Sequence, residues 1–269
     1  MLQTIYKIYA GLIKNRLADG LDERIWKLQF GFRGKQSTAQ AMFICRRLQD
    51  IAERSDEPLT MIFLDWEKAF DKVYQDELIN AVRRMNIPEK MKRILESFYR
   101  NPRFRIKDRD GKSEWRKQRT GIRQGCPLSP YLFVIFMTTL FHDVEKEVGE
   151  KCIEKCMDTV DFSNILYADD TFLVGKRSGE LNKILAAIEK HSDRYGMRLN
   201  RGKCVYINMG NKNTIKFKNG EELKRVEEAD YLGAKITKKN LNRREVEERI
   251  SKALEVRKKL KIFLKKTEC

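Results

Sequence analysis

Histidine, cysteine and proline are scarce in this sequence. Its 269 residues include 2 histidines, 5 prolines and 6 cysteines, and no two cysteines form a C-x-x-C pair. Structural zinc sites use closely spaced Cys and His ligands, and small secreted proteins use paired cysteines for disulfides. The composition therefore predicts neither a zinc site nor a disulfide framework, and it favours free thiols.

Long apolar runs are also absent. The longest, Tyr131–Phe141, contains two threonines and is about half of the roughly 20 residues that a membrane span needs. The N-terminal segment carries Lys7 and Lys14 inside its apolar pattern and has no small-residue cleavage site, which is typical of an amphipathic helix rather than a signal peptide. We expect a protein inside the cell, in the nucleus or cytoplasm, without a membrane partner.

Charge of one sign dominates, but unevenly. The formal net charge is +17, and segments 91–130 and 201–269 carry +8 and +10, whereas 61–90 and 131–200 carry −1 and −3. A nucleic acid fits such basic segments, because neutralised phosphates release counterions. Lysine-rich surface helices of an ordinary soluble protein would give the same total. The hydrophobic fraction of 41% is enough for a core and excludes disorder of the whole chain.

The apolar periodicity alternates between helical and extended segments without a regular strand–helix repeat. This order predicts an α+β fold with an antiparallel sheet, and no repeat or Gly/Ser/Pro-rich linker divides the chain. The expected helices are 1–18, stopped by Gly20, one capped at Ser37 or Thr38, two within 76–100, one capped by Ser129, 178–195, and a C-terminal helix with a capping box at 242–245. The expected strands are 59–65, a hairpin at 104–118, two joined by Asp169-Asp170, and strands near 203–208 and 231–236.

Three carboxylates follow predicted strands. Asp65 ends one strand, and Asp169 and Asp170 form the turn of a hairpin that begins about a hundred residues later. Carboxylates that share one sheet edge raise one another's pKa unless a cation neutralises them. Oxygen ligands without histidine favour Mg²⁺, and two such ions suit phosphoryl transfer. Either motif alone is better explained as a polar turn or a strand end.

An ordered set of motifs resembles the reverse transcriptases of non-LTR (LINE-type) retrotransposons. QFGFRGKQST at 29–38 resembles their fingers motif, FLDWEKAFDKV at 63–73 the first palm motif, and GIRQGCPLSPYLF at 121–133 the second. LYADD at 166–170 resembles the catalytic hairpin, and LNRGKC at 199–204 and YLGAKI at 231–236 the two palm motifs that follow. The order of the set makes coincidence a poor explanation.

The resemblance implies a right-hand polymerase core with an antiparallel palm sheet. It assigns partial fingers to 1–58, palm to 59–75 and 121–240, a fingers/palm connection to 76–120, and the start of a thumb helix to 241–269. The implied activity is RNA-directed DNA polymerisation, in which dNTPs are added to a primer 3′-hydroxyl by two-metal nucleotidyl transfer. RNA template, DNA primer and dNTPs are the implied partners, and the oligomeric state stays open.

The resemblance also implies roles for single residues. Asp65, Asp169 and Asp170 would bind two Mg²⁺ ions, for which Mn²⁺ could substitute, and Lys203 would approach the pyrophosphate as a general acid. The remaining substrate-binding residues are Phe70, which would exclude ribonucleotides, Gln124 and Gly125 beside the incoming nucleotide, and Arg33, which would bind template or shape the fingers.

The two ends of the chain depart from the family pattern. Relatives carry an arginine-containing stretch resembling RPISLL before the segment that starts at Thr4, and neither an endonuclease nor an RNase H segment fits the remaining length. We expect an excised core, truncated in the fingers and thumb. Two alternatives stay open: a catalytically silent fragment that binds nucleic acid, and a reverse transcriptase of the group II intron or retron type.

Overall fold

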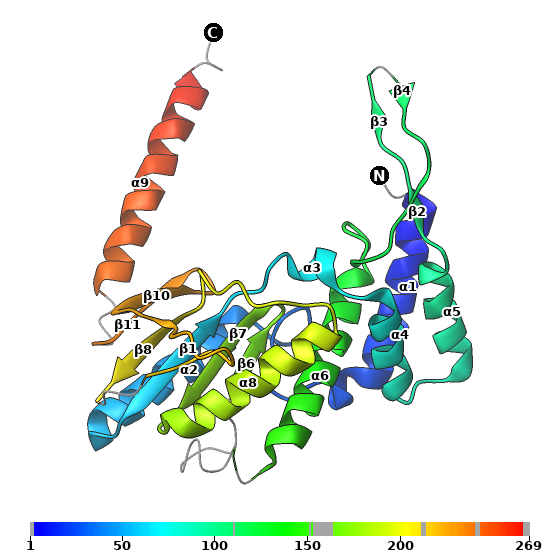
Figure 1. Cartoon of the computed structure of the whole chain (residues 1–269). Helices are drawn as coiled ribbons and strands as arrows, with labels where there is room; N and C mark the ends of the chain where they lie inside the picture. Colours follow the sequence, from blue (N-terminus) through cyan, green and yellow to red (C-terminus); the bar gives the residue numbers. More distant parts are fainter. Residues whose placement is uncertain are drawn as a thin grey trace.

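The fold is organised around a five-stranded sheet (Figure 1). The computed structural model describes residues 3–109, 111–150, 152, 164–210, 214–239 and 243–265. Neighbouring strands pair antiparallel except the last two, which are parallel. An α+β fold with an antiparallel-rich sheet is therefore confirmed. The strand order is β6 (Asn164–Tyr167), β7 (Asp170–Gly175), β1 (Leu59–Leu64), β8 (Val205–Met209) and β9 (Lys224–Arg225).

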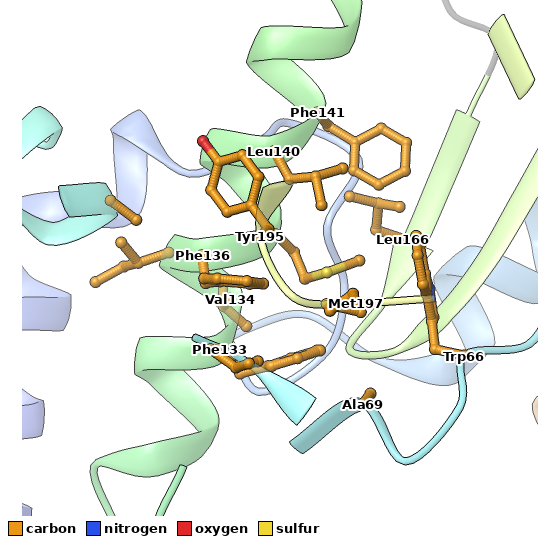
Figure 2. Packing of buried hydrophobic residues seen from close by; sticks show 14 of the residues in the cluster. Trp66, Ala69, Phe133, Val134, Phe136, Leu140, Phe141, Leu166, Tyr195 and Met197 are labelled. Atoms are coloured by element: carbon orange, nitrogen blue, oxygen red, sulfur yellow. The ribbon is translucent and has the colours of Figure 1, made fainter. Parts of the chain in front are cut away.

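Helices cover one face of the sheet and form the larger core. Ile62 and Leu64 of β1 point into this core, and the middle of its long central helix, α6, is buried on all sides. Figure 2 shows Phe133, Phe136 and Phe141 of this helix packed with Tyr195, Met197 and Leu166. The helices are α1 (Thr4–Leu21), α4 (Gln75–Arg84), α5 (Glu89–Tyr99), α6 (Ser129–Val148) and α8 (Ser178–Arg194).

A smaller core covers the opposite face. It contains Met61 and Phe63, the alternate residues of β1, together with α2 (Thr38–Ser55) and a hairpin of β10 (Glu228–Tyr231) and β11 (Ala234–Thr237). Because β1 is buried on both faces, its sequence is a continuous apolar run rather than an alternating one. The strand is therefore fixed from both sides before it reaches Asp65.

Two segments extend away from the sheet and its helices. One is a hairpin made by β2 (Arg103–Phe104), β3 (Lys107–Asp108), β4 (Gly111–Lys112) and β5 (Arg116–Lys117). The other is α9 (Arg243–Lys265). In the view of Figure 1 both extend from the upper side of the protein, with the short helix α3 (Ala69–Lys72) between them.

Most element predictions are confirmed, and four boundaries are corrected. Gly20 does not stop the first helix, which continues to Leu21 before a 3₁₀ turn at Asp22–Arg24. Ser129 is the first residue of α6 rather than its cap, because its hydroxyl donates to the Arg123 carbonyl. The strand expected near 231–236 is the β10–β11 hairpin, and the turn after β6 is Ala168–Asp169, since Asp170 already belongs to β7.

The remaining expectations concern helix caps, membrane-spanning segments and cysteines. Ser37, one of the two caps expected, is the N-cap of α2, and its N–H donates to Gln40 Oε1 at 2.8 Å. The capping box expected at 242–245 includes Asn242, which lies outside the described residues. No helix within the described ranges is long and apolar enough to cross a membrane. The described free cysteines, Cys45, Cys126, Cys152 and Cys204, are all buried.

The central position of α6 leads to a stability prediction. Phe136 is fully buried and makes an edge-to-face contact with Tyr195 at 5.1 Å between ring centroids. We expect Phe136→Ala to lower the free energy of unfolding by about 3–5 kcal/mol, because it removes buried apolar surface and leaves a cavity. Urea denaturation measures this. Phe104→Ala, at a side chain that is 44% exposed, is the control and should change stability by less than about 0.5 kcal/mol.

Candidate active site

The three predicted carboxylates lie at one end of the sheet. Leu64 of β1 pairs with Thr171 of β7, so the next position in this register sets Asp65 opposite Asp170. Residues opposite each other in an antiparallel pair present their side chains on the same face. Asp169 lies in the two-residue turn directly before Asp170. Sequence positions about a hundred residues apart thus lie at the same end of the sheet.

Backbone and side-chain contacts hold the end of β1 in place. The Asn200 N–H donates to the Asp65 carbonyl at 2.8 Å, and the Cys204 thiol donates to the same oxygen at 3.7 Å. The buried Trp66 indole donates through Nε1 to Thr171 Oγ1 at 3.1 Å. These bonds connect β1 to β7 and to the loop before β8, so the Asp65 backbone has little freedom.

The carboxylates are crowded and incompletely neutralised. Asp169 and Asp170 keep exposed surface, yet partial desolvation is the main cause that raises the pKa of Asp170 to about 6, and the nearby Asp169 and Asp65 carboxylates raise it further. Desolvation also raises the pKa of Asp169. Lys203 Nζ lies 3.4 Å from Asp65 Oδ2, an oxygen that accepts no hydrogen bond from the described residues.

The donor chemistry of this end of the sheet fits a divalent cation. Carboxylate oxygens are the ligands that Mg²⁺ prefers, and both the unsatisfied Asp65 oxygen and the raised pKa of Asp170 are conditions that a bound cation relieves. In the described part of the chain, however, no three His, Cys, Asp or Glu side chains form a group able to hold one ion. The carboxylates are neighbours whose oxygens do not converge on one point.

An aromatic side chain and a loop border the carboxylates. Phe70 of α3, half-buried, stacks on Phe133 at 4.4 Å between ring centroids and meets Phe32 edge-to-face at 6.3 Å. The loop before α6 is attached to α3, since the Ile122 N–H donates to the Phe70 carbonyl at 2.7 Å. The three rings and this hydrogen bond fix the position of Phe70.

The same loop contains Gln124 and Gly125. Gln124 Nε2 donates to Asp71 Oδ1 at 2.8 Å. Gly125 has φ +77°, and no described atom lies within 4 Å of the place where its Cβ would be. A positive φ favours glycine, and the open space leaves room for a ligand to approach the backbone.

The guanidinium of Arg33 forms all its hydrogen bonds with groups of the protein itself. Its guanidinium donates five hydrogen bonds, to both Asp22 carboxylate oxygens and to the carbonyls of Asp22, Trp26 and Gln29. The side chain is 8% exposed. These contacts hold the loop that contains Arg33 and use all five of its N–H groups.

Sequence reasoning assigned no role to Gln29, although it recognised the motif that contains it. Its buried amide oxygen accepts the N–H of Ala168, in the turn that carries Asp169, at 2.9 Å. The signal was the position of Gln29 at the start of QFGFRGKQST, a segment expected to lie in the fingers. The structure pairs the first residues of this segment with β6, next to the turn that carries Asp169.

The projecting hairpin presents charge and aromatic rings together. Residues 103–119 contain eight basic and three acidic side chains. Phe104, Ile106 and Trp115 are exposed, and the Arg105 guanidinium lies 4.7 Å from the centroid of the Trp115 ring. Positive charge beside exposed rings is the arrangement on which single-stranded nucleic acids bind and stack.

Comparisons with known proteins identify the family. The family described as "Reverse transcriptase (RNA-dependent DNA polymerase)" matches residues 1–236. The RNA-directed DNA polymerase from the mobile element jockey of Drosophila melanogaster is 27% identical over 221 residues, 79% of this chain and 23% of that protein. The Pol polyprotein of the type-1 retrotransposable element R2 of Nasonia vitripennis is 30% identical over 146 residues, 54% of this chain and 14% of that protein.

Solved structures support the same fold. The apo telomerase of Candida tropicalis, truncated from its C-terminal domain, matches with a TM-score of 0.60 at 16% identity, covering 88% of this chain and 44% of that one. The chain belongs to the reverse transcriptase family, and the LINE-type resemblance is confirmed by its jockey and R2 relatives. It spans less than a quarter of the length of either of these two relatives.

The raised pKa of Asp170 leads to a pH-dependent stability prediction. In metal-free buffer, the folded protein holds the Asp170 proton up to about pH 6, whereas an unfolded aspartate releases it near its ordinary pKa of about 4. Between these values the folded state binds more protons, so this group lowers the free energy of unfolding as pH rises. We expect Asp170→Asn to melt at a higher temperature than wild type at pH 7.5.

The difference should shrink as the pH falls toward 4, because the wild-type carboxyl is then neutral in both states. Thermal denaturation followed by circular dichroism, with chelator present, measures it. Glu53→Gln, which removes an exposed carboxylate on α2, is the charge control. A wild type that is as stable as Asp170→Asn at pH 7.5 would contradict the prediction.

Proposed function

We propose that this chain is the RNA-directed DNA polymerase domain of a LINE-type retrotransposon. It adds dNTPs to a DNA primer 3′-hydroxyl along an RNA template. The observation that carries the proposal is the meeting of Asp65, Asp169 and Asp170 at one end of the sheet, with Lys203 3.4 Å from Asp65. Family membership and the telomerase-like fold support it.

The carboxylates are the proposed ligands of two Mg²⁺ ions, and Mn²⁺ is a substitute. Bound metal would activate the primer hydroxyl and neutralise charge on the leaving pyrophosphate. Lys203, whose ammonium group lies beside Asp65, donates a proton to that pyrophosphate. Asp65, the Asp169–Asp170 pair and Lys203 come from three different parts of the chain, so the proposed reaction centre depends on the tertiary fold.

The aromatic ring and the loop beside the carboxylates select the nucleotide. Phe70, held by Phe133 and Phe32, crowds the 2′ position of the sugar and excludes ribonucleotides. Gln124 and Gly125 lie against the incoming nucleotide, where the open space at Gly125 permits close backbone approach.

The domain roles follow the same scheme. We assign partial fingers to 1–58, where Arg33 shapes the loop, palm to 59–75 and 121–240, the connection to 76–120, and the start of the thumb to 241–269. The template–primer duplex lies over the palm between the basic hairpin and α9. Phosphate contacts hold it, because a polymerase has to accept every sequence.

Primer extension tests the proposal directly. With an RNA template, a DNA primer and dNTPs, the wild-type chain should extend the primer only when Mg²⁺ or Mn²⁺ is present. Asp169→Asn should reduce the extension rate by at least about 100-fold, since loss of a metal ligand removes several kcal/mol of transition-state stabilisation. Glu53→Gln, which removes an equal charge far from the site, should extend normally. A wild type that binds template–primer but never extends it would reject polymerase activity for this chain.

A catalytically silent nucleic-acid-binding domain is the second candidate. One observation favours it: among the described residues, no three His, Cys, Asp or Glu side chains are arranged to hold one ion. This candidate predicts salt-sensitive binding of template–primer without extension. Metal-dependent extension by residues 1–269 would exclude it.

The basic hairpin leads to a salt-dependence prediction. Replacing Lys107, Arg109 and Lys112 together by glutamine should make the negative slope of log affinity against log salt concentration shallower by about 2 to 3. Each lost phosphate contact reduces the magnitude of this slope by about 0.7–0.9. Fluorescence anisotropy with a labelled RNA–DNA primer–template measures it. The matched control replaces three exposed lysines elsewhere, Lys183, Lys190 and Lys216. Equal slopes for the two triple variants would remove the hairpin from the binding surface.

A further inference from the structure

The turn that carries Asp169 has a strained backbone. Ala168, its first residue, has φ +56°. Two-residue hairpin turns that need a positive φ at the first position normally use glycine there. A residue with a Cβ keeps this conformation only when its surroundings impose it. Some neighbouring group must therefore hold Ala168 in place.

Gln29 is that group. Its side chain is fully buried, and Oε1 accepts two backbone N–H groups, those of Ala168 and Gly31, each at 2.9 Å. The flanking backbone pairs with β6, because the Phe30 N–H donates to the Leu166 carbonyl and the Leu166 N–H donates to the Leu28 carbonyl, both at 2.8 Å. The segment 28–30 thus runs beside the catalytic hairpin up to its turn.

Gly31 and Arg33 hold Gln29 in this position. A Cβ on Gly31 would lie 2.3 Å from the Ala168 nitrogen, so only glycine allows this close approach. Arg33 Nη1 donates to the Gln29 carbonyl at 3.0 Å, and Arg33 is itself fixed by two hydrogen bonds to the Asp22 carboxylate. A continuous set of contacts therefore connects Asp22 to Ala168.

We propose that Gln29 is a positioning residue for Asp169. Its amide oxygen fixes the Ala168 N–H, and this bond sets the turn and the direction in which the next residue, Asp169, meets Asp65 and Asp170. An uncharged acceptor suits this place, because a carboxylate would add a fourth negative charge to the cluster. The inference rests on the proposed polymerase function for its kinetic consequence, and its structural consequence is measurable without activity.

A pair of glutamine variants tests the proposal. Gln29→Met keeps the length of the side chain and removes the acceptor. Gln49→Met is the matched control, since Gln49 is also fully buried and hydrogen-bonds backbone, donating to the Thr237 carbonyl at 2.9 Å from α2. Both variants lose one buried glutamine, so both should melt at a lower temperature than wild type.

The kinetic readout separates positioning from stability. For Gln29→Met we expect a kcat about 10- to 100-fold lower and a higher Mg²⁺ concentration at half-maximal rate, the range seen when partners that orient metal ligands are removed. The KM for template–primer should stay within about twofold, because bound nucleic acid contacts other surfaces. Gln49→Met should keep the wild-type kcat and Mg²⁺ requirement. If Gln29→Met matches Gln49→Met in both, Gln29 does not position Asp169.

A glycine pair keeps the test decisive if Gln29→Met does not fold. Gly31→Ala places a methyl group against Ala168 and should, in the same way, lower kcat and raise the Mg²⁺ concentration at half-maximal rate. Gly34→Ala is its control, because no described atom lies within 4 Å of the place that a Cβ would occupy there. Equal kinetics for the two glycine variants would overturn the proposal.

Two further measurements need no polymerase activity. Mn²⁺ affinity, followed by electron paramagnetic resonance, should be weaker in Gln29→Met than in Gln49→Met, and the Ala168 amide, followed by ¹⁵N NMR, should exchange faster with solvent. If the wild type does not extend a primer, the polymerase proposal fails, and these two measurements alone decide the role of Gln29. Unchanged Mn²⁺ affinity and unchanged Ala168 exchange would then overturn it.

Discussion

The antiparallel register between β1 and β7 is the constraint on which the rest of the protein depends. Leu64 pairs with Thr171, and this pairing sets Asp65 beside Asp170. Because side chains alternate between the faces of a sheet, a slip of one residue would move Asp65 to the opposite face. Both cores hold this register, since Ile62 and Leu64 are buried under the helices while Met61 and Phe63 are buried under α2 and the β10–β11 hairpin.

The pairing of β1 with β7 also brings negatively charged side chains close together, and their electrostatic repulsion is unfavourable. Three aspartates lie close enough for Asp169 and Asp65 to raise the pKa of Asp170, and the described residues supply only one ion pair to them, from Lys203. A rigid surrounding structure keeps the carboxylates adjacent in spite of this: the buried Trp66–Thr171 hydrogen bond, the loop contacts of Asp65, and Gln29 on the turn. Functional sites commonly store such strain, which the remainder of the fold supports.

Sequence reasoning predicted the helices and strands well where the cause is local. Ser37 is the N-cap of α2, as one of the two expected alternatives. The two helices expected within 76–100 are separated at Pro88, and the buried strand at 59–64 is a continuous apolar run. It placed boundaries wrongly where tertiary contacts decide them. Gly20 stays helical within α1, and the hydroxyl of Ser129 bonds to the Arg123 carbonyl instead of capping α6.

The sequence by itself determined the elements, the acidic and basic segments and the family, because periodicity, capping and ordered motifs are properties of neighbouring residues. Only the tertiary structure decided which residues meet. It brought Gln29 to Ala168 across 139 positions, enclosed Arg33 among carbonyls, and set Lys203 on Asp65. Such contacts depend on how helices and strands pack, and packing is a collective property of both cores that no single motif encodes.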